Sequence, residues 1–496
     1  MILCFALLVA CGDDDPAPTD TASSATPTLP WTAPTAHTGS TGTSTCDDSF
    51  LAGSTATIQP LSDHRYAWFD GQGRDDDLGY AVACSGTTWA AGAPENSEYA
   101  DLPGGWAYTF DGRSTGQLVE DDASHILHGD PEESDNLGIS LNMSDDGQWL
   151  WAGAWSSKRH IRFSGGVWGV HLPTAEEQVE GDSVDVYVVG AGHGAKAIRG
   201  MPLGDLDGDG IDELMVGNSD GSDVSEDGFL ALYTGADLHD VVFVESATHT
   251  FDDRGAGNIS GRSMWAADID GDGHTDLVHG EPFDDFGPRV AIRLGPLLGG
   301  DADQDLAADV EIVAPTDNGG GVFGDRGDLG DVNGDGVVDL IFEDVSVPVD
   351  GLERAGSAYV FFGPLQRGTS LSADDAHLII EGYASWGHFG SPVVADHDGD
   401  GTNDLIVAQV PWPSSTDCVG RLHVFRGPLE PGRRSALDAD LIYENDRLGS
   451  GAGHAMAACD LDGDGDDEIV VGEPGYSGTE PNAGRVQVVE GWDFAR

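Results

Sequence analysis

An acidic nine-residue segment recurs five times in this chain at an almost constant spacing. The copies are Asp205–Glu213, Asp268–Asp276, Asp331–Asp339, Asp396–Asp404 and Asp460–Glu468, and their first residues lie 63, 63, 65 and 64 positions apart. A fixed period of this length is typical of repeat arrays and β-propellers. The chain is therefore expected to consist of similar structural units rather than of one irregular domain.

Each copy places oxygen-bearing side chains where they can converge on one cation. Positions 1, 3, 5 and 9 carry Asp, Asn or Glu, and the glycine at position 6 permits a sharp turn. Position 7 would offer its backbone carbonyl, so its side chain is free to vary. Oxygen ligands in this number suit Ca²⁺ better than Zn²⁺ or Mg²⁺. An ordinary Asp-Gly turn would explain one copy, but not five copies in phase.

These positions predict about five bound Ca²⁺ ions, one for each segment. The predicted ligands are Asp205, Asp207, Asp209, Ile211 and Glu213 in the first segment; Asp268, Asp270, Asp272, His274 and Asp276 in the second; Asp331, Asn333, Asp335, Val337 and Asp339 in the third; Asp396, Asp398, Asp400, Thr402 and Asp404 in the fourth; and Asp460, Asp462, Asp464, Asp466 and Glu468 in the fifth.

The residues after each segment form short apolar runs such as 214–216 and 405–407. Such runs, with glycine or proline soon after them, indicate β-strands, whereas an EF-hand loop ends in Glu and continues into a helix. The acidic segments are therefore expected to be hairpin loops that join two strands.

One stretch, 389–407, resembles the FG-GAP repeat of integrin alpha-chain β-propellers and related bacterial repeats of the VCBS type. The second half of that motif appears as Gly92–Pro94, Gly280–Pro282 and Gly472–Pro474. The resemblance covers nearly everything after about residue 50. It implies a seven-bladed propeller with calcium in hairpin loops on one face, ligand contacts on the opposite face, and a role in adhesion or ligand binding.

Glycine-containing repeat starts near residues 79, 138, 198, 261, 324, 390 and 453 give seven units. The first two units have tight turns in place of acidic loops. We therefore predict an all-β, seven-bladed β-propeller of four-stranded antiparallel blades, with calcium-binding hairpin loops in blades 3–7. Fourth strands are expected at 241–244, 310–313, 377–380 and 440–443, and the missing fourth strand of the last blade at 65–69.

The N-terminal region predicts export. Residues 1–11 form an apolar run that is too short to span a bilayer and that ends in a lipobox-like Leu-Val-Ala-Cys. Cys11 is then a lipidation site, with a plain signal peptide as the alternative. Residues 12–45 are a Thr/Pro/Ser-rich disordered linker, and 46–496 form the propeller. We expect the protein at a bacterial outer membrane or cell surface, where only its lipid anchor contacts the membrane. The alternative is a secreted or periplasmic protein.

The charge of the chain excludes one class of binding partner. The chain carries 88 Asp and Glu against 22 Lys and Arg, a net charge of −66, which argues against nucleic acid as a partner.

Four cysteines follow the lipobox, and an exported protein would use them in two disulfides, with three possible pairings. We favour Cys84 with Cys459, which hold similar positions in the first and last repeats, and Cys46 with Cys418.

Aromatic residues provide the candidate ligand contacts. Trp386 and Trp412 lie in expected loops. In the first two blades, either Trp149 and Trp151 fill the core, or Trp155, Trp168 and their neighbours form an aromatic platform for sugars or a peptide. An Arg-Gly-Asp tripeptide at 326–328 lies where a strand is expected and is best explained by chance. No zinc-ligand spacing is present.

Non-catalytic adhesion, or binding of a protein or glycan, is therefore the favoured function. The alternative is a secreted polysaccharide lyase or hydrolase, which a cleft gathering His, Arg, Tyr and Glu from several blades would favour. A purely structural scaffold is the third possibility.

Overall fold

The structure is a computed structural model that describes most of the compact unit Ala33–Arg496. The expected signal peptide and linker, with Cys11 and Cys46, lie outside the described residues, as do Trp412 and Cys418. The described residues are 51, 54–94, 104–130, 135–155, 157, 164–173, 178–180, 183–190, 197–218, 229–252, 261, 263–282, 287–298, 308–315, 321–410, 419–478 and 480–492.

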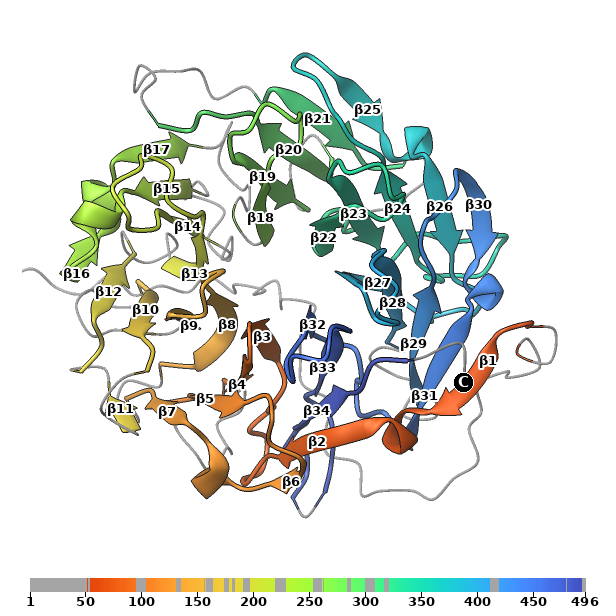
Figure 1. Cartoon of the computed structure of the whole chain (residues 1–496), viewed down its shortest axis with the longest axis horizontal. Helices are drawn as coiled ribbons and strands as arrows, with labels where there is room; N and C mark the ends of the chain where they lie inside the picture. Colours follow the sequence, from red (N-terminus) through yellow and green to blue (C-terminus); the bar gives the residue numbers. More distant parts are fainter. Residues whose placement is uncertain are drawn as a thin grey trace, which may run out of the picture. The chain divides into compact units, whose positions relative to one another are not determined.

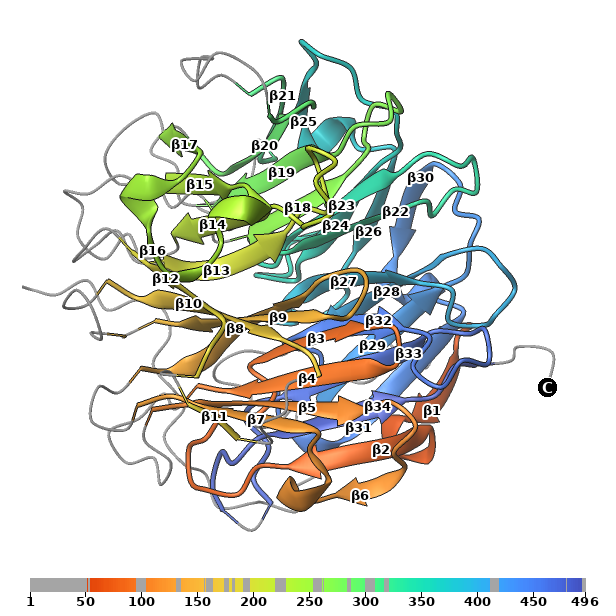
Figure 2. The same ribbon diagram turned by 60° about the vertical axis from the view of Figure 1, so that its left-hand side comes forward.

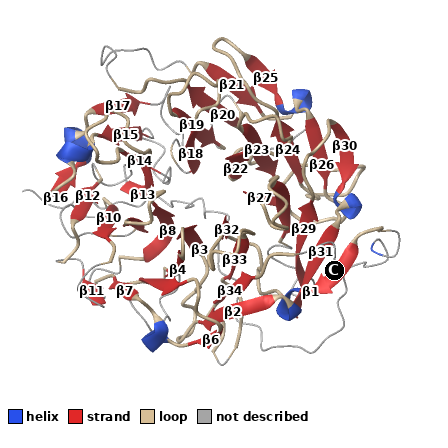
Figure 3. Ribbon diagram, in the orientation of Figure 1, coloured by secondary structure: helices blue, strands red, loops and turns tan. Residues whose placement is uncertain are grey.

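Seven small sheets follow one another around a central axis, so the predicted seven-bladed β-propeller is confirmed (Figure 1). In blades 1–6 the chain fills each sheet from the strand nearest the axis outward. Helical structure is limited to single 3-10 turns in the described part of the chain (Figure 3). None of the described helices is long and apolar enough to cross a bilayer.

Each blade contains four antiparallel strands that run from the axis to the rim. From the innermost strand outward, blade 1 has β3 (Ala81–Ser85), β4 (Thr88–Ala93), β5 (Trp106–Asp111) and β7 (His125–His128); blade 2 has β8 (Leu137–Met143), β9 (Trp149–Ala154), β10 (Gly166–His171) and β12 (Val186–Val189); blade 3 has β13 (Ala197–Pro202), β14 (Leu214–Asn218), β15 (Phe229–Tyr233) and β17 (His249–Asp252); blade 4 has β18 (Ser263–Ala267), β19 (Asp276–Glu281), β20 (Arg289–Arg293) and β21 (Val310–Val313); blade 5 has β22 (Gly327–Gly330), β23 (Asp339–Asp344), β24 (Ser357–Phe361) and β26 (Leu378–Glu381); blade 6 has β27 (Phe389–Ala395), β28 (Asp404–Gln409), β29 (Val419–Phe425) and β31 (Leu441–Leu448); blade 7 has β32 (Met456–Cys459), β33 (Glu468–Glu473), β34 (Arg485–Val489) and β2 (Arg65–Asp70).

Six blades carry a fifth strand that the sequence did not predict. It is short and pairs in parallel with the outermost strand. Five of these strands come from the segment that links the third and fourth strands of the next blade, and the sixth, β1, directly precedes the N-terminal strand of blade 7. In these six places one blade holds its predecessor at the rim; among the described residues blade 3 has four strands. The fifth strands are β1 (Thr57–Pro60), β6 (Gly116–Leu118), β11 (Gln178–Glu180), β16 (Asp240–Phe243), β25 (Ser370–Ser372) and β30 (Gly432–Ser435).

This arrangement corrects one predicted strand. The run 241–244 was expected to be the fourth strand of blade 3, but its first three residues belong to β16, which pairs in parallel with β12 of blade 2. The fourth strand of blade 3 is β17, which pairs with β15. The apolar composition of 241–244 correctly indicated a strand, but composition does not specify which neighbour a strand pairs with.

The start of the chain completes the last blade. Strand β2 pairs antiparallel with β34 of blade 7, and β1 pairs in parallel with β31 of blade 6 (Figures 1 and 2). The strand expected at 65–69 is thus β2, whereas β1 was not expected. Closure in this way leaves no open sheet edge between the two ends of the propeller.

Glycine pairs explain why the FG-GAP spacing recurs. The glycine near the end of the second strand in one blade lies against a glycine at or just before the start of the first strand in the next blade. A Cβ atom added at the first of these positions would lie far inside van der Waals contact with a backbone carbonyl oxygen, so only glycine fits. The distance from the added Cβ would be 2.1 Å from Gly92 to Gly138 O, 2.0 Å from Gly280 to Gly324 O and 2.0 Å from Gly472 to Gly79 O.

Tryptophans fill the two blades that lack acidic loops. Trp89 is fully buried and stacks on Phe110 with ring centroids 4.4 Å apart. Trp168 is also fully buried, and Trp151 is 4% exposed. These residues therefore belong to the core and not to a surface platform.

Candidate functional site

The five acidic segments lie between the first and second strands of blades 3–7. They follow β13, β18, β22, β27 and β32, and each is followed directly by the second strand of its blade. Because these first strands all run in the same direction along the propeller, the five loops lie at the same end of it. The hairpin-loop interpretation agrees with this placement.

The first carboxylate of each segment organises the loop around itself. Asp205 Oδ1 accepts hydrogen bonds from the N–H groups of Gly208 and Asp209 at 2.7 and 3.0 Å, and Oδ2 accepts one from Gly210 at 2.9 Å. Gly210 has a φ of 89°, a conformation that favours glycine. The position-6 glycine is therefore required by the backbone itself.

The carboxylate at position 9 fixes the loop to the rest of its blade. Asp276, which is fully buried, accepts hydrogen bonds from the N–H of Ile269 at 2.7 Å and from the N–H of Gly295 at 2.6 Å. Gly295 follows the third strand, so this contact ties the loop to the adjacent turn. Asp339 makes the equivalent contacts with Val332 and Gly363, both at 3.0 Å.

Burial raises the pKa of these position-9 carboxyl groups. The pKa of Asp339 is raised to about 6 and that of Asp404 to about 7, while that of Glu468 is raised to about 8. Desolvation is the largest cause in each case, and nearby carboxylates of the same loop add to it. A bound cation would favour the charged form and so would counteract both effects.

Carboxylate oxygens from several positions of a loop gather within 4.8 Å of one another. Such groups could hold a metal ion. In the loop 331–339 the amide of Asn333 is 3.1 Å from Asp335 Oδ2 and takes one of these places. The groups are Asp205, Asp207 and Glu213; Asp268, Asp270 and Asp276; Asp396, Asp398 and Asp400; Asp460, Asp462 and Asp464; and Asp464, Asp466 and Glu468.

Three buried oxygen atoms in these loops support a fit to a cation. Asp396 Oδ1, Asp404 Oδ2 and Asp466 Oδ1 have no hydrogen-bond partner among the described residues. Buried polar atoms nearly always have a partner, and a bound cation would provide one for each of these atoms. The side chain of Ile211 at position 7 is 46% exposed, which agrees with a backbone carbonyl being the ligand there.

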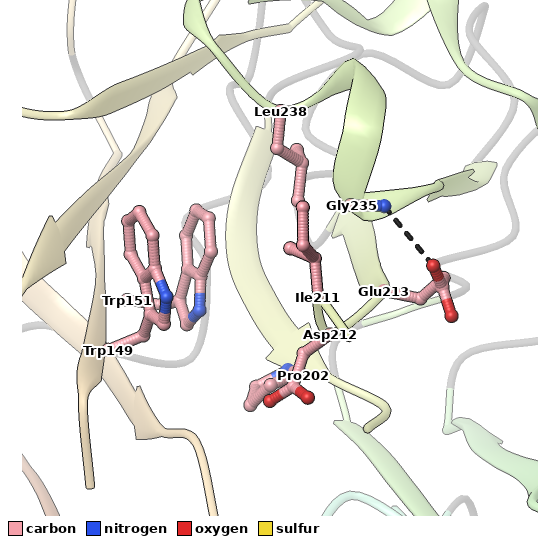
Figure 4. A pocket seen from close by; sticks show the side chains of 8 residues that line it. All are labelled: Trp149, Trp151, Pro202, Ile211, Asp212, Glu213, Gly235 and Leu238. Carbon is pink, nitrogen blue, oxygen red and sulfur yellow. Dashed lines mark hydrogen bonds between the residues drawn. The ribbon is translucent and has the colours of Figure 1, made fainter. Parts of the chain in front are cut away.

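Two residues near the loops were not singled out from the sequence. Arg426 donates hydrogen bonds to Asp398 and Asp400 of the blade 6 loop. Its position directly before a Gly-Pro pair, where other loop-bearing blades have no basic residue, was the available signal. Leu238 lines a pocket together with Trp149 and Trp151, beside Ile211 and the Glu213–Gly235 hydrogen bond (Figure 4).

Trp386 lies at the opposite end of β27 from the blade 6 loop and is 40% exposed. The guanidinium of Arg354 is 5.2 Å from the centroid of its ring, and the ring of His388 packs edge-on at 6.1 Å. The N–H of Trp386 donates to Glu353 O at 2.7 Å. The backbone therefore holds this aromatic ring at the surface in a fixed position.

Strained backbone is concentrated around Trp386. Of the ten non-glycine residues with positive φ in the described chain, five lie between positions 350 and 391. Such strain costs of order 1–3 kcal/mol for each residue and often marks functional sites. The five residues are Asp350, Arg354, Trp386, His388 and Ser391.

The Arg-Gly-Asp tripeptide is not displayed as a loop. Gly327 and Asp328 begin β22, and the Asp328 carboxylate accepts a hydrogen bond from Val394 N–H at 2.8 Å. Arg326 donates to Ser391 Oγ at 2.6 Å. Both charged side chains thus hold the inner strands of neighbouring blades together, in agreement with a chance match to the adhesion tripeptide.

A His, Arg, Tyr and Glu group does form from blades 1, 5 and 7: Tyr80, Arg326 and His454 lie just before the innermost strands β3, β22 and β32, and Glu343 lies in β23. Arg326 Nη2 lies 3.3 Å from His454 Nδ1, and the His454 and Tyr80 rings are 5.1 Å apart. Glu343 is 1% exposed and accepts the N–H of Ser391. The carboxylate of Glu343 is thus enclosed, whereas Tyr80 and Arg326 are only partly buried.

Comparison with known proteins supports the same family. Residues 452–489 match the family model of the FG-GAP repeat. The chain is 33% identical to phosphatidylinositol-glycan-specific phospholipase D of Rattus norvegicus over 29% of its length and 18% of that protein. It is 27% identical to integrin alpha pat-2 of Caenorhabditis elegans over 44% of its length and 18% of that protein, and 28% identical to integrin alpha-PS2 of Drosophila melanogaster over 42% and 15%.

The chain therefore spans less than a fifth of the length of these curated relatives. The predicted resemblance to the FG-GAP propellers of integrin alpha chains is confirmed by the matched repeat, by the integrin relatives and by the seven blades.

Proposed function

We propose that this chain is a calcium-binding β-propeller that binds a protein or glycan ligand without catalysis. The observation that carries the proposal is the division of the molecule into two ends. Acidic loops occupy one end of blades 3–7, and the strained, aromatic surface around Trp386 and Arg354 occupies the other.

Five Ca²⁺ ions, one in each loop, account for the acidic clusters and for the unpartnered buried oxygens. Carboxylates at positions 1, 3, 5 and 9 would hold each ion, with Asn333 at one of these positions and backbone carbonyls at position 7. A bound ion supplies the positive charge that lets these carboxylates stay ionised side by side. The loops then act as cation-bridged hairpins that stabilise the blades.

Trp386 is the proposed centre of the ligand surface. An exposed tryptophan supplies a large apolar contact area with few rotatable bonds, and a neighbouring arginine adds a charged donor. Two of the relatives are integrin alpha chains, and the resemblance to that family supports a protein or glycan as the ligand. Trp412 remains a second proposed contact.

We also propose that the protein is exported and held at the envelope by a lipid on Cys11, with the secreted form as the alternative. Release of the protein from membranes by Cys11→Ser would test the anchor. A protein that stays membrane-bound after this substitution would contradict it.

An enzymatic function is the second candidate, because the chain is similar to phosphatidylinositol-glycan-specific phospholipase D over 29% of its length. A lyase or hydrolase acting on polysaccharide or lipid would need an accessible catalytic group, whereas the carboxylate of Glu343 beside His454 is buried. Turnover of a polysaccharide or glycosylphosphatidylinositol substrate by the purified chain would favour this candidate.

The binding proposal is tested by screening the full chain against glycans and envelope proteins, with and without Ca²⁺. We expect a ligand whose binding is lost in Trp386→Ala and retained in Val313→Ala, since Val313 is a similarly exposed apolar residue at 43%. A ligand that binds Trp386→Ala as well as the wild type would contradict the proposed surface.

A further inference from the structure

We propose that the blade 6 loop, Asp396–Asp404, contains a built-in competitor for its cation, the guanidinium of Arg426. This inference rests on the proposed calcium function and concerns the regulation of one of its sites. It predicts that the blade 6 loop binds Ca²⁺ more weakly than the same loop without the arginine.

Arg426 reaches two of the four predicted carboxylate ligands of this loop. Its Nε is 2.6 Å from Asp398 Oδ2, and its Nη2 is 3.1 Å from Asp400 Oδ2. These oxygens belong to positions 3 and 5. The guanidinium is therefore bound where the positive charge of the ion would otherwise be.

The ion pair is better formed than a simple surface contact. The Asp398 side chain is 2% exposed, whereas the Arg426 and Asp400 side chains are 37% and 42% exposed. The backbone N–H of Arg426 donates to Asp440 at 2.9 Å, so the base of the side chain is fixed as well. A charge-assisted, two-pronged contact of this kind is stronger than a neutral hydrogen bond.

The other loop-bearing blades provide an internal comparison. The residue that precedes the glycine after the third strand is Arg426 in blade 6. The equivalent residues are Thr234 in blade 3, Leu294 in blade 4, Phe362 in blade 5 and Glu490 in blade 7. Only blade 6 places a basic side chain at this position, so the repeats themselves show that the propeller does not require one.

Arg426 leaves part of the ligand set unsatisfied. Asp404 is 1% exposed, and its Oδ2 atom has no hydrogen-bond partner among the described residues; the same holds for Asp396 Oδ1. The carboxylates at positions 1 and 9 therefore each keep a buried oxygen that a cation could bind, even though the arginine has paired with positions 3 and 5. The loop fits an ion that must displace the guanidinium to complete its coordination.

The cost of that displacement sets the expected effect. Partly exposed ion pairs contribute up to about 1 kcal/mol, which corresponds to roughly fivefold in a dissociation constant. Arg426→Gln keeps a hydrogen-bonding side chain but removes the charge. We therefore expect it to tighten the blade 6 site by up to about fivefold.

The experiment is a calcium titration of the full chain by isothermal titration calorimetry after removal of bound metal. Arg426→Gln should strengthen the weakest binding step by up to about fivefold and leave the other steps unchanged. Arg433→Gln is the matched control, because Arg433 pairs with Glu381 on β26, away from every loop, and should behave as the wild type. Four ions in the wild type and five in Arg426→Gln would support the inference equally.

Two outcomes separate this inference from the calcium proposal. If Arg426→Gln leaves every step unchanged or weakens one, while Asp270→Ala removes one ion, the inference is overturned and the calcium sites stand. If none of the variants nor the wild type binds Ca²⁺, the proposed calcium function itself is wrong, and the inference falls with it.

Discussion

Cys84 in β3 and Cys459 in β32 form a disulfide, with their Cα atoms 6.2 Å apart. The two strands are the innermost strands of the first and last blades. The bond therefore crosses the seam at which the propeller closes, on the inner side of the blades. Strands β1 and β2 close the same ring at the rim, so closure is both covalent and hydrogen-bonded.

Removal of this disulfide should destabilise the propeller. The cysteines are 375 residues apart, and a long closed loop restricts the unfolded chain most strongly. We expect the double variant Cys84→Ser/Cys459→Ser to lose about 2–5 kcal/mol of unfolding free energy. Denaturant unfolding measures this loss, with the reduced wild type as the control. An unchanged midpoint would contradict a structural role for the bond.

The glycine pairs between neighbouring blades should leave no room for a side chain. In Gly472→Ala the new Cβ would lie 2.0 Å from Gly79 O, which belongs to the backbone and cannot move aside cheaply. We expect a loss of about 3 kcal/mol or more, or failure to fold. Gly116→Asn is the control, because Gly116 has a φ of 84° with open space around it, and asparagine accepts that conformation. Equal stability of the two variants would disprove the claim that the glycine pair excludes a side chain.

Glu343 should make stability depend on pH. Burial raises its pKa to about 7 from 4.5, with Asp325 and Asp344 adding to the rise and Arg326, which contacts His454, opposing it. Because the carboxyl pKa is higher in the folded than in the unfolded chain, this group's contribution to the free energy of unfolding is fully present below about pH 4.5. The contribution is lost as the pH rises through 7.

Glu343→Gln removes that loss because glutamine does not ionise. Relative to the wild type, the variant should therefore gain roughly 1–3 kcal/mol in unfolding free energy between pH 5 and pH 8. Urea titrations of both proteins at the two pH values measure the difference. A difference that stays constant with pH would show that Glu343 does not titrate in this range.

Much of this architecture could be predicted because its signals are local. Each acidic loop carries its expected ligands within nine residues, and the glycines that mark the seams recur at the repeat spacing. Position 343 holds Glu where Gly217, Gly280 and Gly472 stand in other repeats, so an internal alignment could also have found that exception.

The features that escaped prediction depend on partners far away in the chain. The run at 241–244 looks like any apolar strand, and only the fold places it beside β12 of the preceding blade. Arg426 lies 28 residues from Asp398 and 26 from Asp400, so nothing in the loop sequence announces their contact. Patterns over a few residues predict the strands of a blade. They do not predict contacts between segments that are far apart in the chain.

A single loop should contribute only part of the calcium effect. At 1 mM Ca²⁺, a site with a dissociation constant of ~0.1–1 mM contributes ~0.4–1.4 kcal/mol by mass action. Asp270→Ala should therefore lower the unfolding free energy by about that amount in calcium and by little in chelator. A loss of the same size in both conditions would mean that Asp270 acts through packing and not through an ion.

The most direct test of the central claim is the thermal melting curve of the full chain in millimolar Ca²⁺ and in excess chelator. If five ions bridge the acidic hairpins, their combined contribution of about 2–7 kcal/mol should place the melting temperature in calcium clearly above that in chelator. Melting curves that coincide in the two conditions would contradict the account.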